Sequence, residues 1–417
     1  MKHRYPIKKF VRLFGFLLAL GIFVFNFTSG MAMARALPAV IFTEAGTGGS
    51  VSALSALPGG AVAACETGDE TLASRRLHVR LFGIIELRSI PVLESTRREL
   101  IPCGDAVGIS IRSEGLLIVG FGEIIDFSGK SVCPAAGSGL RAGDIVITAN
   151  GAAVRTAGEL QLALNADRER TVLEIDRDGR RFEIALSPSN GQDGNCRIGV
   201  WVRDSTVGIG TLSFADTGGG VAALGHAVVD ADTGRLLPVH SGELVKASIL
   251  GVTRGRAGSP GELRGTFSSE NERIGSIVLN SALGVFGAAD AEFFRAASAE
   301  RAAIPVAFPN EVHEGEAYLI AQIGSGGTET YSCRIVRTAR QDRPDQKGLV
   351  IEITDERLLS GTGGIVQGMS GSPIIQDGRL AGVITHVFVN DPVRGYGVYA
   401  YWMSRALEEA AGAAYAG

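Results

Sequence analysis

Short apolar segments in which hydrophobic and polar positions alternate dominate the chain from residue 77 onward, and glycine-containing turns separate them. The segment at 77–92 alternates well enough to predict two strands that bend at Gly83. Similar segments continue to the C-terminus, for example GIGTLSF and GLVIEITD. Helical periodicity is confined to residues 157–166, residues 290–300 and the tail YWMSRALEEAAGAA. These patterns predict a mainly β protein, and roughly 220 C-terminal residues of short strands fit a double barrel or a sandwich.

The N-terminal residues 1–35 form a part of their own. They begin with a flank that holds five Lys or Arg residues and no acid, and an apolar run follows at 13–27. A basic flank before an apolar run is typical of a cleaved signal peptide or of an uncleaved membrane anchor, and the length of this run does not decide between them. In both cases the rest of the chain is predicted to lie outside the cytoplasm.

The remaining chain is predicted to divide into a linker with a short β region at 36–103, a β module at 104–190 and a larger β domain at 191–417. The module resembles a PDZ domain of the bacterial protease type. GLRAGDIVITANG is its most specific segment, and Asp178-Gly179 marks a hairpin turn. The resemblance implies that Val107, Gly108 and Ile109 form the loop that binds a peptide carboxylate through backbone N–H groups.

Charge and cysteine content exclude several classes of function. The chain carries 40 Lys and Arg residues against 44 Asp and Glu residues, and the N-terminal flank holds five of the basic ones. The part beyond the flank is therefore clearly acidic, which makes nucleic acid a poor partner. Five cysteines without a C-x-x-C spacing argue against zinc and against a redox dithiol. We expect no metal, no cofactor and mainly lone buried cysteines.

The segment GMSGSP contains the candidate nucleophile, Ser370. A glycine-rich loop precedes it, and two strands joined by Asp377-Gly378 follow it. An α/β-hydrolase elbow would need G-x-S-x-G leading into a helix, which this segment does not provide. GMSGSP is close to the GDSGGP signature of chymotrypsin-type enzymes. By this likeness, the N–H groups of Gly368 and Ser370 would form an oxyanion hole in the present chain. The alternative is a tight turn that is built from small residues.

A serine hydroxyl needs a base that takes its proton, so a histidine must be available. His226, in LGHAVVDADTG, precedes Ser370 as the base precedes the serine in chymotrypsin-type enzymes, and it is the best candidate. His386 follows Ser370 in the segment ITHVFV and fits a structural histidine better. Weaker candidates are His240, His78 and His313.

The third member of a triad orients the imidazole and stabilises its charged form. Asp355 ends a hydrophobic strand 15 residues before Ser370, and Asp230 and Asp232 lie close to His226 in the sequence. An aspartate at the end of a strand is often only a helix or turn cap, so the pattern leaves these alternatives open.

Together these motifs resemble the SpoIVB (stage IV sporulation protein B) serine peptidase family. The resemblance rests on GIGTLSF, on LGHAVVDADTG, on the PDZ-like module and on the segment from TDERLL to YAYWM, and it covers most of the chain from residue 77 onward. It implies a chymotrypsin-like serine peptidase with His226 as base, Ser370 as nucleophile and Asp355 as the acid. The short interval between Asp355 and Ser370 departs from the chymotrypsin spacing.

The resemblance also implies a biological role. Members of this family are made in the forespore and are exported to the space between the two membranes. There they cleave themselves and then a membrane-bound regulator of an intramembrane metalloprotease, which leads to processing of a sigma-factor precursor. The PDZ module would hold polypeptide targets. Two other hypotheses are a catalytically weak scaffold with a peptidase-like fold, and an esterase or amidase for small substrates.

Overall fold

The structure is a computed structural model of the chain, and it describes residues 7–45, 61–66, 75–81, 84–267 and 272–414. The chain forms two compact units. One unit extends to Arg98 and includes two later segments, Phe308–His313 and Ala339–Pro344. The other unit holds the remainder of the chain.

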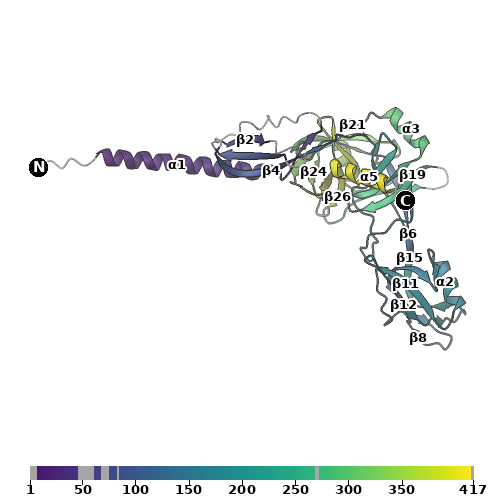
Figure 1. Cartoon of the computed structure of the whole chain (residues 1–417). Helices are drawn as coiled ribbons and strands as arrows, with labels where there is room; N and C mark the ends of the chain where they lie inside the picture. The colour runs from purple at the N-terminus through teal and green to yellow at the C-terminus, as the bar shows by residue number, and fades with distance from the viewer. Residues whose placement is uncertain (1–6, 46–60, 67–74, 82–83, 268–271, 415–417) are drawn as a thin grey trace. The chain divides into compact units, whose positions relative to one another are not determined.

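The first unit holds a long helix and a four-stranded sheet (Figure 1). Helix α1 spans Ile7–Ala36, and its segment Phe10–Ala32 is long and apolar enough to cross a membrane, with none of its most apolar window buried. This length and exposure fit a membrane anchor or a signal sequence. The sheet has the order β1 (Ile41–Glu44), β4 (Ile85–Ser95), β3 (Arg76–Leu81) and β2 (Ala61–Glu66). The two strands predicted within 77–92 are β3 and β4, which pair antiparallel.

A first barrel in the second unit closes through two long strands. Its strands follow the order β6 (Ala106–Phe121), β17 (Ser241–Thr253), β19 (Arg273–Ser281), β20 (Gly284–Ala289), β16 (Gly220–Ala223) and β15 (Val200–Asp216), and β15 pairs again with β6. Alternate residues of β6, namely Val107, Ile109 and Ile111, lie in one buried core. Burial of each such side chain contributes about 1.5–3 kcal/mol.

A second barrel closes through six strands in the order β22 (Gly315–Ala321), β23 (Glu329–Thr338), β24 (Leu349–Ile353), β27 (Asp391–Tyr399), β26 (Arg379–Phe388) and β25 (Pro373–Gln376). Asp377 and Gly378 join β25 to β26 with φ values of 49° and 72°, as a two-residue hairpin requires. Helix α5 (Ala400–Ala414) packs against strands of both barrels. The predicted double barrel is therefore confirmed.

The β module leaves the first barrel along β6 and returns to it along β15. The distal half of β6 pairs with β9 (Ile145–Ala149) and with the start of β15, and the sheet continues through β11 (Thr171–Arg177) and β12 (Arg180–Leu186). Helix α2 (Ala157–Ala166) begins at a capping box formed by Thr156 and Glu159. The predicted helix and the hairpin at Asp178-Gly179 are confirmed.

Short elements complete the second unit. They are β5 (Glu99–Pro102), β7 (Ile124–Ile125), β8 (Ser131–Val132), β10 (Ala152–Ala153), β13 (Ser189–Asn190), β14 (Cys196–Arg197), β18 (Glu262–Phe267), β21 (Ile304–Pro305), α3 (Ala291–Glu300) and α4 (Glu356–Thr362). The four cysteines with described side chains, Cys103, Cys133, Cys196 and Cys333, are free. Burial raises the pKa of Cys103 and of Cys333 to about 12, so these two thiols remain protonated and unreactive.

Candidate active site

The turn that carries Ser370 lies between α4 and β25. Helix α4 begins at Asp355 and ends at Gly363, whose φ of 77° stops the helix in the left-handed region. Gly368 and Gly371 also have positive φ values, 96° and 107°. A Cβ on Gly371 would lie 2.0 Å from the carbonyl oxygen of Thr211, so only glycine allows the turn to pack this closely on the first barrel.

Backbone hydrogen bonds in this turn leave two N–H groups without a partner. The N–H of Met369 donates to Val366 O at 3.1 Å, and the N–H of Gly371 donates to Ile384 O at 2.8 Å. The N–H groups of Gly368 and Ser370 have no hydrogen-bond partner among the described residues. Both residues line the same cavity, so these are the two donors that a tetrahedral oxyanion would need.

Thr211 of β15 holds the two peptide units of this turn. Its Oγ1 donates to Gly368 O at 2.7 Å, and its N–H donates to Ser370 O at 3.0 Å. The residue is buried, with 2% of its surface exposed. These bonds fix the peptide units Gly368–Met369 and Ser370–Gly371, which flank the peptide unit that carries the Ser370 N–H and so restrict its orientation. Sequence reasoning missed this role, although Thr211 lies within the conspicuous segment GIGTLSF.

Replacing Thr211 by valine is expected to lower kcat for peptide cleavage by about tenfold while KM changes little, because the loss of the Oγ1 bond loosens the peptide unit of Gly368. Steady-state kinetics on a peptide substrate measure the effect. The matched control is Thr171→Val, because the Thr171 hydroxyl is buried in β11 without a hydrogen-bond partner in the described part of the chain. Equal kinetics in both variants would contradict the positioning role of Thr211.

His226 reaches the cavity through a sharp turn after β16. Leu224 and Gly225 have φ values of 73° and 72°, which lead the chain out of the first barrel. A Cβ on Gly225 would lie 3.1 Å from Cγ2 of Thr385, so the turn packs against the second barrel. His226 Nδ1 lies 2.9 Å from Ala227 O, and a carbonyl only accepts. Nδ1 therefore carries the proton, and Nε2 is left as the basic nitrogen.

Asn280 of β19 anchors the segment that follows His226. Its Nδ2 donates to Val228 O at 2.7 Å and to Leu237 O at 2.9 Å, and its Oδ1 accepts from Val228 N at 2.9 Å. The side chain is buried. These bonds hold the backbone two residues beyond the imidazole, and no motif in the sequence identified Asn280.

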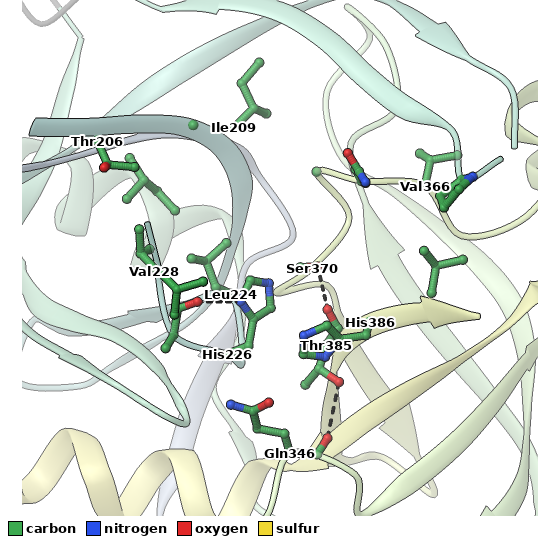
Figure 2. A pocket seen from close by; sticks show the side chains of 18 of the residues that line it. Thr206, Ile209, Leu224, His226, Val228, Gln346, Val366, Ser370, Thr385 and His386 are labelled. Atoms are coloured by element: carbon green, nitrogen blue, oxygen red, sulfur yellow. Dashed lines mark hydrogen bonds between the residues drawn. The ribbon is translucent and has the colours of Figure 1, made fainter. Parts of the chain in front are cut away.

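Ser370, His226 and His386 lie together at the cavity (Figure 2). The ring centroids of the two histidines are 4.8 Å apart. Ser370 Oγ donates to Thr385 O at 2.6 Å, and no hydrogen bond joins it to either imidazole. A rotation of the serine side chain away from this carbonyl is therefore needed before a histidine can take its proton.

The model of the SpoIVB peptidase S55 family matches residues 194–404, which span half of the chain. The chain belongs to this family. The match covers His226, Asp355 and Ser370, and it makes the protein a serine peptidase of a sporulation-related family. No curated protein matches.

Two solved structures are similar to this family member over about half of its length. The Rv3671c protease from M. tuberculosis in its active form is 16% identical, covers 49% of this chain and 74% of its own, and has a TM-score of 0.27. Its inactive form is 15% identical, covers 48% and 83%, and has a TM-score of 0.25.

Asp355 of this SpoIVB-family peptidase acts as the N-cap of α4. Its Oδ1 accepts from Arg357 N at 2.9 Å, and its Oδ2 lies 3.0 Å from Arg357 Nη2 and accepts from Ser332 N at 3.2 Å. The bond to Arg357, followed by these backbone donors, lowers the pKa of Asp355 to about 2. No hydrogen bond among the described residues joins this carboxylate to His226, so its proposed place in a triad is not assembled in this conformation.

The other predicted candidates have different partners. Asp230 is buried against Arg203 and Thr233, and Asp232 contacts the same arginine at 2.7 Å. His78 contacts Glu86 at 3.1 Å. His240 and His313 do not line the cavity that holds Ser370. No cluster of three or more His, Cys, Asp or Glu side chains in the described ranges is arranged to hold a metal ion.

Variants of Asp355 separate a cap from a catalytic acid. Asp355→Asn keeps an oxygen that accepts from the helix N-terminus, so it is expected to preserve most of the cleavage rate, whereas Asp355→Ala is expected to lower the free energy of unfolding by about 1 kcal/mol. Thermal unfolding and cleavage kinetics of both variants test this. A loss of about 10⁴ in kcat in the folded Asn variant would instead make Asp355 the third member of the triad.

Burial lowers the pKa of His226 below its ordinary value of 6.5. Only the neutral imidazole accepts the serine proton, so kcat/KM is expected to fall as the pH drops through this lowered pKa. We expect the midpoint of the acid limb below 6.5, and kinetics from about pH 4.5 to 8 on folded protein measure it. An acid limb centred above pH 7 would contradict His226 as the base.

The residues predicted to form the PDZ loop lie in a paired strand. Gly108 of β6 is opposite Ile209 of β15 on one edge and Val245 of β17 on the other, and Val107 and Ile109 are buried. Because both edges are paired, these three residues form no loop and cannot receive a peptide carboxylate. The resemblance placed the peptide-binding loop at residues 107–109, but in the structure these residues belong to strand β6 of the first barrel.

A different groove occurs in the β module, between α2 and the start of β15. It has a volume of about 360 Å³, and its lining includes Leu160, Leu164, Ile198, Gly199, Val200 and Trp201. The residues at the start of β15 pair with β6 on one edge and with no other strand in the described part of the chain. Gly199 has a φ of 77°, and a Cβ there would lie 2.6 Å from Gly122 O.

Proposed function

We propose that Ser370 and His226 form the catalytic pair of a serine endopeptidase. The observation that carries the proposal is the cavity of about 600 Å³ that both side chains line, together with the unpartnered N–H groups of Gly368 and Ser370. In the reaction, Ser370 Oγ attacks the scissile carbonyl carbon while Nε2 of His226 takes its proton. The two N–H groups hold the oxyanion of the tetrahedral intermediate.

The second half of the reaction uses the same groups. His226 donates the proton to the leaving amine, and the C–N bond breaks to give an acyl-enzyme on Ser370. Water then gives a proton to Nε2 of His226 as its oxygen attacks the ester carbon. Nε2 returns this proton to Ser370 Oγ as the C–Oγ bond breaks, which releases the carboxylic acid and restores the hydroxyl. In this arrangement the carbonyl of Ala227 fixes the tautomer of His226. The further role of Asp355 stays a prediction that its Asn and Ala variants test.

We propose the biological role that the family resemblance implies. The peptidase acts on polypeptides, among them its own chain and a membrane-bound regulator of an intramembrane metalloprotease, on the side of the forespore membrane that faces the intermembrane space. Membership of a sporulation-related family and the apolar helix α1 support this proposal.

We further propose that the groove between α2 and β15 is the peptide site of a PDZ-like module. An open strand edge offers main-chain hydrogen bonds to an extended peptide, and a neighbouring helix receives its side chains. Trp201 lines the groove and is 67% exposed, whereas Trp402 is buried. A change in tryptophan fluorescence when a peptide is added therefore reports mainly on the groove. A peptide with a free C-terminal carboxylate is expected to change this fluorescence at a lower concentration than its amide. Equal titrations would contradict recognition of a chain end.

Active-site labelling tests the catalytic proposal. The full chain in detergent is treated with a fluorophosphonate, which reacts only with an activated serine, and the modified residue is identified by peptide mass. Labelling of Ser370 that disappears in a folded His226→Ala variant is the expected result. A folded protein that is not labelled and still binds peptides would favour the scaffold hypothesis. Labelling of another serine would overturn the assignment of the nucleophile.

A further inference from the structure

The cavity beside Ser370 has walls without charged side chains. Twenty residues line it, and none of them is Asp, Glu, Lys or Arg. Eleven are aliphatic, and six of those are valines. The remainder are glycines, neutral hydroxyl and amide side chains, and the two histidines. The aliphatic walls and the nucleophile belong to one cavity, since Val366 and Val387 line it together with Ser370.

The two histidines do not supply a compensating positive charge at neutral pH. Burial lowers the pKa of His226, and partial burial, the neighbouring His226 and Lys347 together lower the pKa of His386 to about 4. Both imidazoles are therefore neutral at pH 7. A substrate carboxylate or ammonium group that binds against these walls loses part of its hydration and meets no oppositely charged side chain among the lining residues, which is unfavourable.

We propose that this peptidase cleaves beside uncharged aliphatic residues and rejects substrates with an acidic or basic side chain next to the scissile bond. The inference rests on the proposed function of Ser370 and adds the class of substrate. Aliphatic side chains of the substrate gain from burial against the valine walls, whereas each buried and unpaired charge carries a penalty. We expect kcat/KM to be at least about a hundredfold higher for Val or Leu than for Asp or Lys at that position.

The first experiment uses peptide aldehydes, which add reversibly to the serine, as competitors of fluorophosphonate labelling at Ser370. The aldehydes differ only in the residue that carries the aldehyde, which is Val, Leu, Asp or Lys. The Val and Leu compounds are expected to protect Ser370 at concentrations at least about a hundred times lower than the charged compounds. Equal protection by all four, or stronger protection by a charged one, would overturn the inference while leaving the catalytic proposal intact. Absence of any labelling would instead mean that the proposed function fails.

A charge placed in the wall provides the second experiment. Val389 lines the cavity and is 52% exposed, so Val389→Asp should fold, and it is expected to improve protection by the Lys aldehyde about tenfold relative to wild type. The matched control is Val278→Asp, because Val278 is 45% exposed on β19 and does not line the cavity. If the Lys aldehyde protects the Val389 variant no better than wild type, or if Val278→Asp improves its protection equally, this wall does not contact the substrate side chain.

Discussion

Replacing Ser370 by alanine is expected to abolish self-cleavage and peptide cleavage, with a loss of about 10⁶ in kcat. Without Oγ no acyl-enzyme forms, and the oxyanion hole alone supplies only the residual acceleration that such sites retain. The fold should persist, because Oγ makes a single hydrogen bond, to Thr385 O. Incubation of the full chain, followed by intact mass and by kinetics on a peptide, measures the effect.

Ser372 offers a matched control for this substitution. It lies two positions beyond Ser370 and is fully buried, and its hydroxyl has no hydrogen-bond partner in the described structure. Ser372→Ala therefore removes the same atom from the same turn, and it should leave both stability and cleavage nearly unchanged. Normal proteolysis in the Ser370 variant would rule out Ser370 as the nucleophile, and a comparable loss in both variants would indicate that the turn had merely been disturbed.

Replacing His226 by alanine is expected to lower kcat by about 10⁴ to 10⁶, because the base proposed to take the serine proton is then absent. The comparison that decides the role is His386→Ala. His386 lines the same cavity with its ring centroid 4.8 Å from that of His226, yet only His226 has its tautomer fixed by a backbone carbonyl. We expect the His386 variant to keep most of the activity.

Kinetics of the two folded variants on one peptide substrate give the result. A larger loss in His386→Ala than in His226→Ala would transfer the role of base to His386. Circular dichroism of both variants excludes unfolding as the cause, and fluorophosphonate labelling of Ser370 provides a second readout that does not depend on the choice of peptide.

Local signals in the sequence predicted much of this fold. The Asp-Gly turns at 178–179 and 377–378 identified two hairpins, because the left-handed φ values that they need are most accessible to such residues. Short motifs, and the order in which base and nucleophile follow one another, pointed to the serine turn and to His226, and both line one cavity in the structure. The helix at 157–166 was marked by its apolar spacing.

The remaining features depend on contacts between distant segments. The seven-residue helix α4 was missed, since so short a helix shows little periodicity. The hydrogen bond that holds the turn at Ser370 joins Thr211 to Gly368, which are 157 residues apart in the sequence. The expected PDZ loop at 107–109 was misplaced because a buried strand and a loop before a strand share the same pattern of glycine and β-branched residues.

The strand β15 passes through both the groove of the β module and the cleavage site. Trp201 lines the groove, and Gly208 lines the cavity beside Ser370. Gly208 lies seven residue positions after Trp201 along the strand, a distance of at most about 23 Å. If a polypeptide engages the proposed peptide site and the proposed catalytic site at once, about seven of its residues in extended form can span the distance between them.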